Sequence, residues 1–382
     1  MSTRQIGGLT ALRFFAAFAI LFHHVKGNFF PPDFMRGLPL DAGVTFFFVL
    51  SGFILSHRYS ETGISGGLPR FYVARFARLW PAHIFCLLVL LVCIPWQREL
   101  LQMGNNVYIF VLNLLMLHSA VPIPDVYFSF NAVSWSISTE IYFYIAFPFL
   151  LIWFKTQPVL KLCCAVMVGV LLGYSLDASN VLYYAADKLD KVSSHGFVYI
   201  SPVARIQEFM LGIVCQQLLS KLQLGSVKKV SATALEMTAL LAILLLTPLL
   251  GFYSAKIAGP SNIALSEVYR HTSMAILFAA VISCFYMDKG LISKALAWRP
   301  LVFLGEISFS LYLIHQVIIR FVVQDQLLVG YPSYTGFLVV VAASIASAAF
   351  IWHFVEKPSQ KSILRLYDYL MLKLDRRSTD PA

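Results

Sequence analysis

Residues 9–27 read LTALRFFAAFAILFHHVKG, an apolar stretch long enough to cross a membrane but interrupted by a few ionisable side chains. A transmembrane helix needs about 20 mostly apolar residues. Comparable stretches recur near 41–56, 80–97, 135–154, 159–177, 201–219, 232–251, 269–287, 301–323 and 334–355. The sequence therefore predicts an all-α polytopic membrane protein, a bundle of about ten transmembrane helices.

The composition agrees with that fold class. Of 382 residues, 59% are hydrophobic and only 13% are charged, whereas an average soluble domain has about 25% charged residues. So few charges cannot cover a soluble surface of this size. The first stretch lacks a small-residue cleavage site, so it is expected to be a retained span. The six cysteines all lie in apolar stretches without CxxC pairs, so neither a disulfide framework nor a metal site is predicted.

The distribution of lysine and arginine predicts the topology. Cytoplasmic loops of membrane proteins carry an excess of these residues. Ten spans with both termini in the cytoplasm place most loop lysines and arginines inside. An eleventh span at 105–121 would reverse this bias for all later loops, so 105–121 is predicted to be a re-entrant segment. The net charge of +10 then reflects topology, and no nucleic-acid partner is expected.

Two regions follow from these spans. Residues 1–355 form a single transmembrane domain. Residues 356–382 form a basic cytoplasmic tail, partly amphipathic, which is expected to lie on the inner membrane surface.

Ionisable residues inside spans are the first candidates for a functional site, because each costs at least ~2.5–3.5 kcal/mol to insert near the bilayer centre. Arg13 and His24 are separated by three helical turns and share one face of the first span, about 16 Å apart. They are expected near the cytoplasmic side and in the outer third, respectively. A fixed cation and a titratable base on one face suggest a path across the membrane, although lipid snorkelling and interhelical hydrogen bonding are the alternatives.

Three further motifs add candidates. RFYVARFARLWP, placed between spans two and three, carries Arg75 and Arg78, which suit either a membrane anchor or a clamp for phosphates. NAVSWSISTEIYFYIAFP places Glu140 at a depth similar to that of His24, where it can orient the imidazole as a general base. GEISFSLYLIHQVIIR places three polar side chains on one face as a possible substrate path or as polar packing: Ser308, Tyr312 and His315.

Arg205 and Glu208 are i, i+3 neighbours. They are predicted to form a structural ion pair rather than part of a site.

Taken in order, these motifs resemble those of the acyltransferase-3 family of integral membrane acyltransferases over roughly residues 7–360. LRFFAAFAILFHH carries its R-x10-H pattern, GVTFFFVLSGF its second-span signature and ARFARLWP its R-x-x-R pair. SWSISTEIYFY, GEISFSLYLIHQ and VEKP match the three remaining elements. Thr45 stands where many members have Asp, and Ile141 where a second acidic residue commonly follows, so those two positions receive no role.

The resemblance implies an O-acyltransferase that moves an acyl group, most often acetyl, from cytoplasmic acyl-CoA to a hydroxyl of an extracytoplasmic carbohydrate. By this resemblance, Arg13, Arg75 and Arg78 hold the CoA phosphates, while His24 and Glu140 are catalytic. Acyl-CoA is a co-substrate, and no bound cofactor is expected. Some relatives carry an SGNH-type esterase domain, and this sequence is identified as the form without one.

Two other classes remain open from the residues alone. A transporter for glycans or lipid-linked sugars would also use ten spans with buried charges, although no symmetry between the two halves is evident. A proton- or anion-conducting protein is the third possibility, but it gives Arg75 and Arg78 no role.

Overall fold

The structure is a computed structural model that describes residues 6–31, 34–35, 37–59, 63–64, 67–93, 107–185, 187–222, 227–324 and 333–379. Within these ranges the chain is helical and contains no strand. Nine described helices are long and apolar enough to cross a membrane, or ten if the bent pair α13 and α14 forms one span. The prediction of an all-α polytopic membrane protein with about ten spans is confirmed.

The elements are, in chain order, α1 (Gly7–Phe29), η1 (Leu40–Ala42), α2 (Gly43–Tyr59), α3 (Gly67–Cys93), α5 (Val107–Leu114), η2 (His118–Ala120), α6 (Pro124–Tyr127), η3 (Ala132–Ser134), α7 (Trp135–Trp153), α8 (Pro158–Ala178), η4 (Gly196–Ile200), α9 (Pro202–Ser220), α10 (Lys229–Ala258), α11 (Ile263–Tyr286), α12 (Leu291–Leu296), α13 (Arg299–Glu306), α14 (Ser308–Gln324), α15 (Ser333–Ile351), η6 (Trp352–Glu356) and α16 (Lys357–Thr379).

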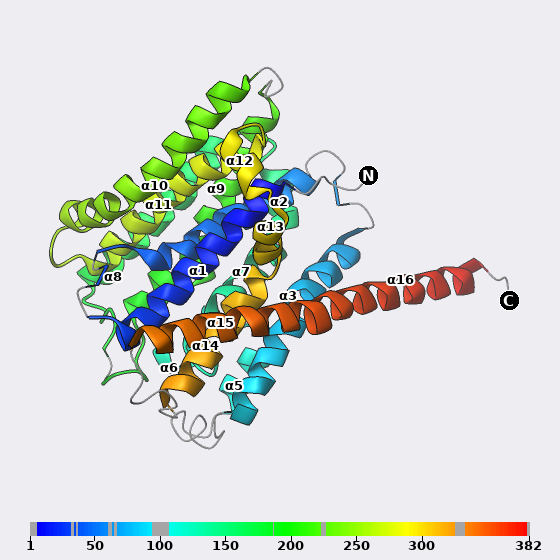
Figure 1. The fold of residues 1–382 in the computed structure, drawn as a ribbon, viewed down its shortest axis with the longest axis horizontal. Helices are drawn as coiled ribbons and strands as arrows, with labels where there is room; N and C mark the ends of the chain where they lie inside the picture. The colour runs from blue at the N-terminus through cyan, green and yellow to red at the C-terminus, as the bar shows by residue number, and fades with distance from the viewer. Residues whose placement is uncertain are drawn as a thin grey trace.

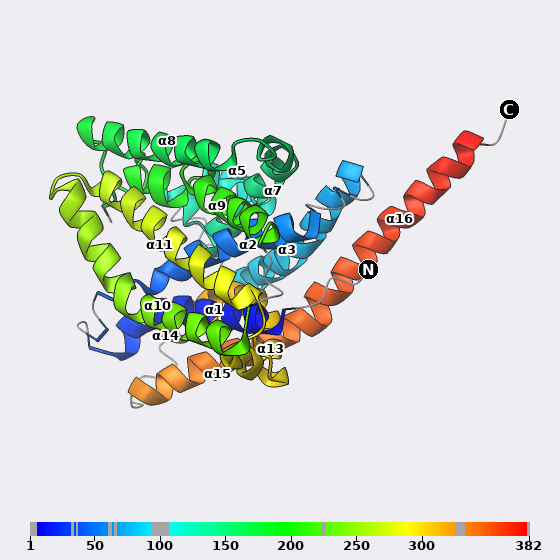
Figure 2. The same ribbon diagram turned by 90° about the horizontal axis from the view of Figure 1, so that it is seen from above.

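Helices α2 and α9 form the centre of the bundle (Figure 1). They run side by side in the same direction, and glycines let their backbones approach closely. An ideal Cβ on Gly52 would lie 2.0 Å from the carbonyl oxygen of Phe209, and one on Gly212 would lie 2.0 Å from that of Val49. Small residues at such crossings allow close packing between membrane helices. Helices α8 and α15 lie on opposite flanks of this centre (Figure 2).

We call the end of the bundle where α1 begins the proximal end and the end where α1 finishes the distal end. Because successive spans alternate in direction, α2, α7, α9 and α11 all run from distal to proximal. Helix α2 does not start at the distal surface, since an ideal Cβ on Gly43 would lie 2.7 Å from the carbonyl oxygen of Ala16, in the middle of α1. The segment before α2 therefore returns along α1 into the bundle.

In its described part, residues 107–121, the segment predicted to be re-entrant contains a short helix, α5. Helix α5 has eight residues and is about 12 Å long, too short to cross a bilayer. Its end lies beside the middle of α3, because Trp80 donates to the carbonyl of Leu114 and the His83 ring bonds the carbonyl of Asn113. Residues 105 and 106 lie outside the described ranges.

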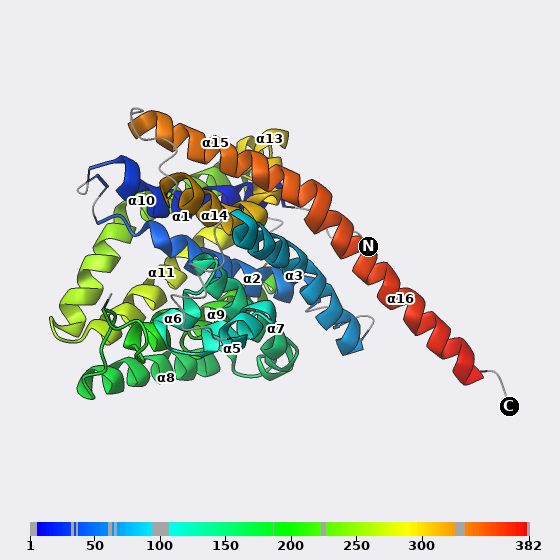
Figure 3. The same cartoon turned by 90° about the horizontal axis from the view of Figure 1, so that it is seen from below.

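One predicted boundary differs from the structure. The segment RFYVARFARLWP is not a loop before the third span but the first half of α3, which begins at Gly67. The division between a transmembrane domain of residues 1–355 and a tail of residues 356–382 stays a prediction. A π-helical turn, η6, joins α15 directly to α16, and α16 continues in nearly the same direction away from the bundle (Figures 1 and 3). Its position on a membrane surface stays a prediction.

The ninth predicted span, 301–323, is not straight. Helices α13 and α14 meet at an angle of 61° around Ile307. Just before the bend, an ideal Cβ on Gly305 would lie 1.9 Å from the carbonyl oxygen of Thr10 in α1. The missing side chain therefore lets the bend pack against the start of α1.

Candidate active site

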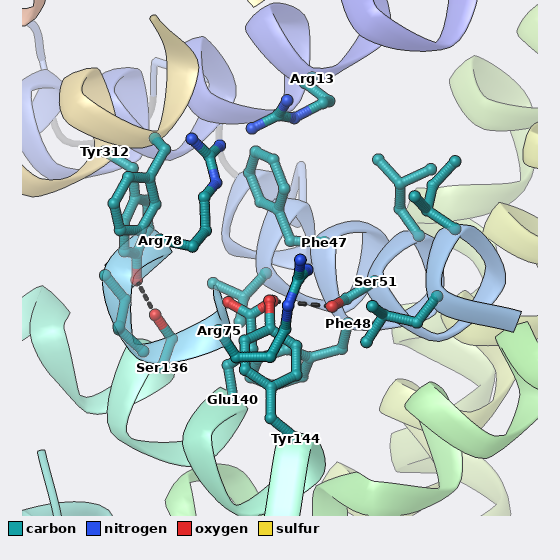
Figure 4. Close-up of a pocket in the computed structure, with 16 residues that line it drawn as sticks. Arg13, Phe47, Phe48, Ser51, Arg75, Arg78, Ser136, Glu140, Tyr144 and Tyr312 are labelled. Atoms are coloured by element: carbon teal, nitrogen blue, oxygen red, sulfur yellow. Dashed lines mark hydrogen bonds between the residues drawn. The ribbon is translucent and has the colours of Figure 1, made fainter. Parts of the chain in front are cut away.

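A polar cavity of about 200 Å³ lies between α1, α2, α3, α7 and α14 in the proximal half of the bundle. Figure 4 shows its polar side chains converging from these five helices. Phenylalanines form much of the remaining wall. The polar lining residues are Arg13, Ser51, Arg75, Arg78, Ser136, Glu140, Tyr144 and Tyr312.

The three predicted arginines all line this cavity. Arg75 and Arg78 lie one turn apart on α3, and Arg13 faces them from α1 (Figure 4). Arg78 forms an ion pair with Glu356. Within the described part of the chain, neither Arg13 nor Arg75 donates a hydrogen bond, and the buried Nε of Arg75 has no partner.

The charges of the cavity are therefore not balanced. Three guanidinium groups face the carboxylates of Glu140 and Glu356, which leaves one positive charge in excess. A guanidinium with unused donors in a confined, partly apolar space is suited to bind a phosphate or another anion. The arrangement favours the clamp over a simple membrane anchor for Arg75 and Arg78.

Glu140 belongs to the same cavity and does not orient His24, so that prediction is wrong. Its Oε1 accepts hydrogen bonds from the hydroxyls of Ser51, at 2.7 Å, and Tyr144, at 2.5 Å. The guanidinium of Arg75 lies over the Tyr144 ring, with its central carbon 5.7 Å from the ring centre. Glu140 thus lies beside the arginines in the cavity and is joined to α2 through Ser51.

His24 is paired with His315 instead. The Nδ1 atom of His24 lies 3.1 Å from Nε2 of His315, and the two ring centres are 5.2 Å apart. The other nitrogen of His315, Nδ1, is 3.2 Å from the carbonyl oxygen of Leu311. A carbonyl only accepts, so this Nδ1 carries a proton.

These partners define the protonation of both neutral rings. Since His315 carries its proton on Nδ1, its Nε2 accepts and Nδ1 of His24 donates. The lone pair of His24 is then on Nε2, on the side of the ring away from His315. His24 is only partly buried, so a ligand can approach this basic nitrogen.

The predicted polar face of α14 is divided by the structure. Tyr312 lines the cavity, donates to the carbonyl of Val133 at 2.9 Å and accepts from Ser136 at 2.7 Å. Its ring centre is 5.9 Å from that of His315. Tyr312 therefore joins the arginine cavity to the histidine pair. Ser308 is buried and donates to the carbonyl of Gly305 at 2.7 Å, so it supports the bend and does not line the cavity.

Four residues of the site are not predicted from the sequence: Ser51, Ser136, Tyr144 and Glu356. Glu356 is almost completely buried, pairs with Arg78 and accepts from Ser310 at 2.7 Å. It lies in VEKP, so the motif itself is the available signal, but the predicted boundary at 355 places its glutamate in the tail. Tyr144 lies one helical turn after Glu140, a spacing that places both side chains on one face.

Comparison with known proteins identifies the family of the chain. The family model described as an acyltransferase domain, Acyl_transf_3, matches residues 6–355. The chain is 27% identical to the acyltransferase MdmB of Streptomyces mycarofaciens, over 83% of this chain and 80% of that protein. No solved structure matches it significantly.

Two longer proteins are also similar. The O-acetyltransferase OatA of Staphylococcus aureus is 26% identical over 97% of this chain, which spans 60% of that protein. The putative peptidoglycan O-acetyltransferase YrhL of Bacillus subtilis is 26% identical over 93% of this chain and 55% of its own length. The family model covers more than nine-tenths of the sequence, and the chain belongs to the acyltransferase-3 family.

Proposed function

We propose that this protein is a membrane O-acyltransferase that moves an acyl group, with acetyl as the first candidate, from cytoplasmic acyl-CoA to a hydroxyl of an extracytoplasmic or exported carbohydrate. The observation that carries the proposal is the continuous polar line between α1 and α14. It begins at the arginine cavity, passes Tyr312 and ends at the His24–His315 pair. The names of OatA and YrhL support O-acetyl transfer, and that of YrhL supports a glycan acceptor.

The proposed donor site is the arginine cavity. Acyl-CoA carries phosphates at one end and a thioester at the end of a long flexible arm. Arg13 and Arg75 have unused donors for the phosphates, and the apolar walls formed by Phe47 and Phe48 suit the arm. In this proposal Glu140 holds Ser51 and Tyr144 at the cavity wall and is not the base.

The proposed base is Nε2 of His24. It takes the proton of the acceptor hydroxyl as the hydroxyl oxygen attacks the thioester carbonyl carbon. The tetrahedral intermediate then releases the CoA sulfur, and His24 returns the proton to that sulfur, so the products are an ester and a thiol. His315 holds the tautomer that leaves Nε2 of His24 free and stabilises the transient imidazolium.

The orientation of the protein is part of the proposal. Arg58 of α2, Arg70 of α3 and Lys161 of α8 lie near the proximal ends of their helices. The positive-inside rule therefore assigns this end, with the arginine cavity, to the cytoplasm where acyl-CoA is made. The histidine pair then lies toward the side from which an extracytoplasmic acceptor arrives.

Purified protein in lipid nanodiscs provides the test. Acetyl-CoA is added with a sugar acceptor, release of the CoA thiol is followed, and the sugar is weighed by mass spectrometry. We expect one acetyl mass added per thiol released, and transfer slowed at least about 100-fold in His24→Ala protein that inserts normally. If His24→Ala transfers acetyl at the wild-type rate, the proposal is wrong. If vesicles take up the sugar without consuming acetyl-CoA, the protein is a transporter.

A further inference from the structure

A second cluster of charged side chains lies away from the arginine cavity, around the start of α2 and the distal half of α11. Arg270 bonds Asp41 of η1 at 2.9 Å and also pairs with Glu267 one turn earlier on α11. The hydroxyl of Tyr199, in η4, donates to the same oxygen of Asp41 at 3.3 Å. His271 Nε2 lies 2.9 Å from Glu267. None of these residues lines the arginine cavity.

A fully buried ion pair supports this cluster from below. Arg205 and Glu208 on α9 approach to 2.6 Å, with side chains 1% and 0% exposed, which confirms the structural ion pair expected from their spacing. Arg205 also donates to Thr45 of α2 at 3.0 Å and to the carbonyl of Tyr199 at 3.1 Å. Arg205 thereby ties α2, α9 and η4 together and fixes the position of the residues above it.

The upper part of the cluster is open, in contrast to its base. The side chains of Asp41, Arg270 and Glu267 are 21%, 17% and 13% exposed. Each of the two carboxylates, of Asp41 and Glu267, binds the Arg270 guanidinium through only one of its oxygens. In the described chain, the other oxygens, Oδ1 of Asp41 and Oε2 of Glu267, accept no hydrogen bond. Two carboxylates share one guanidinium at this point, so the open edge presents unused acceptors and an excess negative charge.

An aromatic wall stands beside these acceptors. The rings of His195 and Tyr199 are stacked, with centres 4.7 Å apart and planes at 16°. Tyr183 meets His195 edge-on at 5.2 Å, and Tyr184 lies 5.9 Å from it and is 44% exposed. Burial lowers the pKa of His195 to about 4, so its ring is neutral at pH 7 and adds no positive charge to the wall.

This combination identifies the class of ligand. Sugar hydroxyls donate to carboxylates and accept from a guanidinium, while the apolar C–H faces of a sugar ring pack on aromatic rings. A few converging polar groups on an aromatic lining are typical of small-molecule sites. The excess of carboxylates disfavours a phosphate. We infer that Asp41, Glu267 and Arg270, with the wall of Tyr184, His195 and Tyr199, bind the carbohydrate acceptor; we call this set the acceptor cradle.

The cradle is close to the proposed base, and the inference rests on the proposed function. Both η1, which carries Asp41, and α11, which carries Glu267 and Arg270, pack against α1, and the charge of Asp41 lies within electrostatic range of His23 and His24. His23, next to His24 on α1, has a buried Nδ1 without a hydrogen-bond partner within the described residues. In this proposal a sugar held by Asp41 and Glu267 presents a hydroxyl to Nε2 of His24.

The test compares acceptor kinetics of single variants in nanodiscs with acetyl-CoA. The probes are the disaccharide of N-acetylglucosamine and N-acetylmuramic acid, and maltotriose. Asp41→Asn and Glu267→Gln keep the side-chain shape but remove the charge. We expect roughly a tenfold or larger rise in KM for the sugar, as for a lost hydrogen bond to a charged group, with the KM for acetyl-CoA unchanged. If the charged variants fail to fold, Tyr184→Ala tests the cradle in their place. Tyr184 is at an exposed position, and its replacement should raise the same KM.

Asp177→Asn is the matched control. Asp177 is also an aspartate at the distal end, but it caps the start of α11 through the backbone N–H groups of Ala264 and Leu265. It should affect stability without changing the KM for the sugar. An unchanged sugar KM in folded Asp41→Asn and Glu267→Gln, or in Tyr184→Ala when those do not fold, overturns the cradle alone. Failure of the wild-type protein to acetylate either sugar overturns the proposed function instead.

Discussion

Arg78 of α3 forms an ion pair with Glu356, which lies in the π-helical turn between α15 and α16, 278 residues further along the chain. The second carboxylate oxygen of Glu356 accepts from Ser310 of α14 at 2.7 Å. One glutamate therefore joins α3, α14 and the last long helix at the wall of the arginine cavity. Single π-helical turns inside longer helices are frequently found at functional sites.

Loss of this ion pair should destabilise the protein. Glu356→Gln leaves the Arg78 guanidinium without its carboxylate, and we expect the free energy of unfolding to fall by about 1.5–3 kcal/mol, as for a hydrogen bond to a charged group. The change is measured by thermal unfolding in detergent. A cycle with Arg78→Gln should give less than additive effects, because both variants remove the same interaction.

A second ion pair also joins α3 to the C-terminal part of the chain, and it provides the control. Arg70 and Asp368 join α3 to α16 at 2.9 Å, but their side chains are 43% and 45% exposed. Asp368→Asn should cost much less stability than Glu356→Gln, since exposed pairs contribute little. Equal losses for Asp368→Asn and Glu356→Gln would mean that burial does not strengthen the Arg78–Glu356 pair.

The cavity arginines should control affinity for the donor. Arg13→Ala or Arg75→Ala removes a guanidinium with unused donors, and we expect the Kd for acetyl-CoA to rise about 10- to 100-fold, from the loss of a charge-assisted contact. Binding is measured by calorimetry in nanodiscs. Arg299→Ala, at an exposed position at the start of α13, is the control and should bind normally. If Arg13→Ala and Arg75→Ala bind as tightly as Arg299→Ala, the phosphates are held elsewhere.

Variants of the histidine pair should lower catalysis without weakening binding of the donor. His24→Ala should lower kcat by about 10²–10⁴-fold, the usual contribution of a general base, while the KM for acetyl-CoA stays unchanged. His315→Gln keeps an acceptor for Nδ1 of His24 and should lose less activity than His315→Leu, which cannot accept. Steady-state kinetics of the three variants measure this order. Wild-type kcat in His315→Leu would show that His315 does not hold the tautomer of His24.

The spans are predictable because apolar length alone defines them. Residues that share a face of one helix are also predictable, and Tyr312 and His315 on α14 are an example. Contacts between helices are not, since periodicity fixes side chains only relative to their own helix axis. This is why the sequence pairs Glu140 with His24, whereas the structure places it beside Ser51 and Tyr144.

The depth of Asp41 is not predictable from the sequence for a related reason. Depth estimates assume that each span starts at the membrane surface, whereas α2 starts level with Ala16, in the middle of α1. The segment before α2 therefore carries Asp41 into the interior, and no hydropathy pattern indicates that carboxylate. The motifs do identify Arg13, Arg75 and Arg78 as a group, because their residue types already suit one anion.

The central crossing of α2 and α9 gives a last prediction. Gly52→Ala places a methyl group where the Phe209 carbonyl oxygen lies 2.0 Å away, so the two backbones must separate. We expect a loss of about 1–3 kcal/mol in unfolding free energy, as for overpacked cores, measured by thermal unfolding in detergent. Gly251→Ala in α10 is the matched control, since an added Cβ there meets nothing within 4 Å. It should be neutral or stabilising by up to about 1 kcal/mol, because alanine favours a helix interior. A Gly52→Ala protein as stable as Gly251→Ala would mean that α2 and α9 are not packed backbone to backbone. The close packing of α2 on α9 would then not explain how Ser51 of α2 is held beside Glu140.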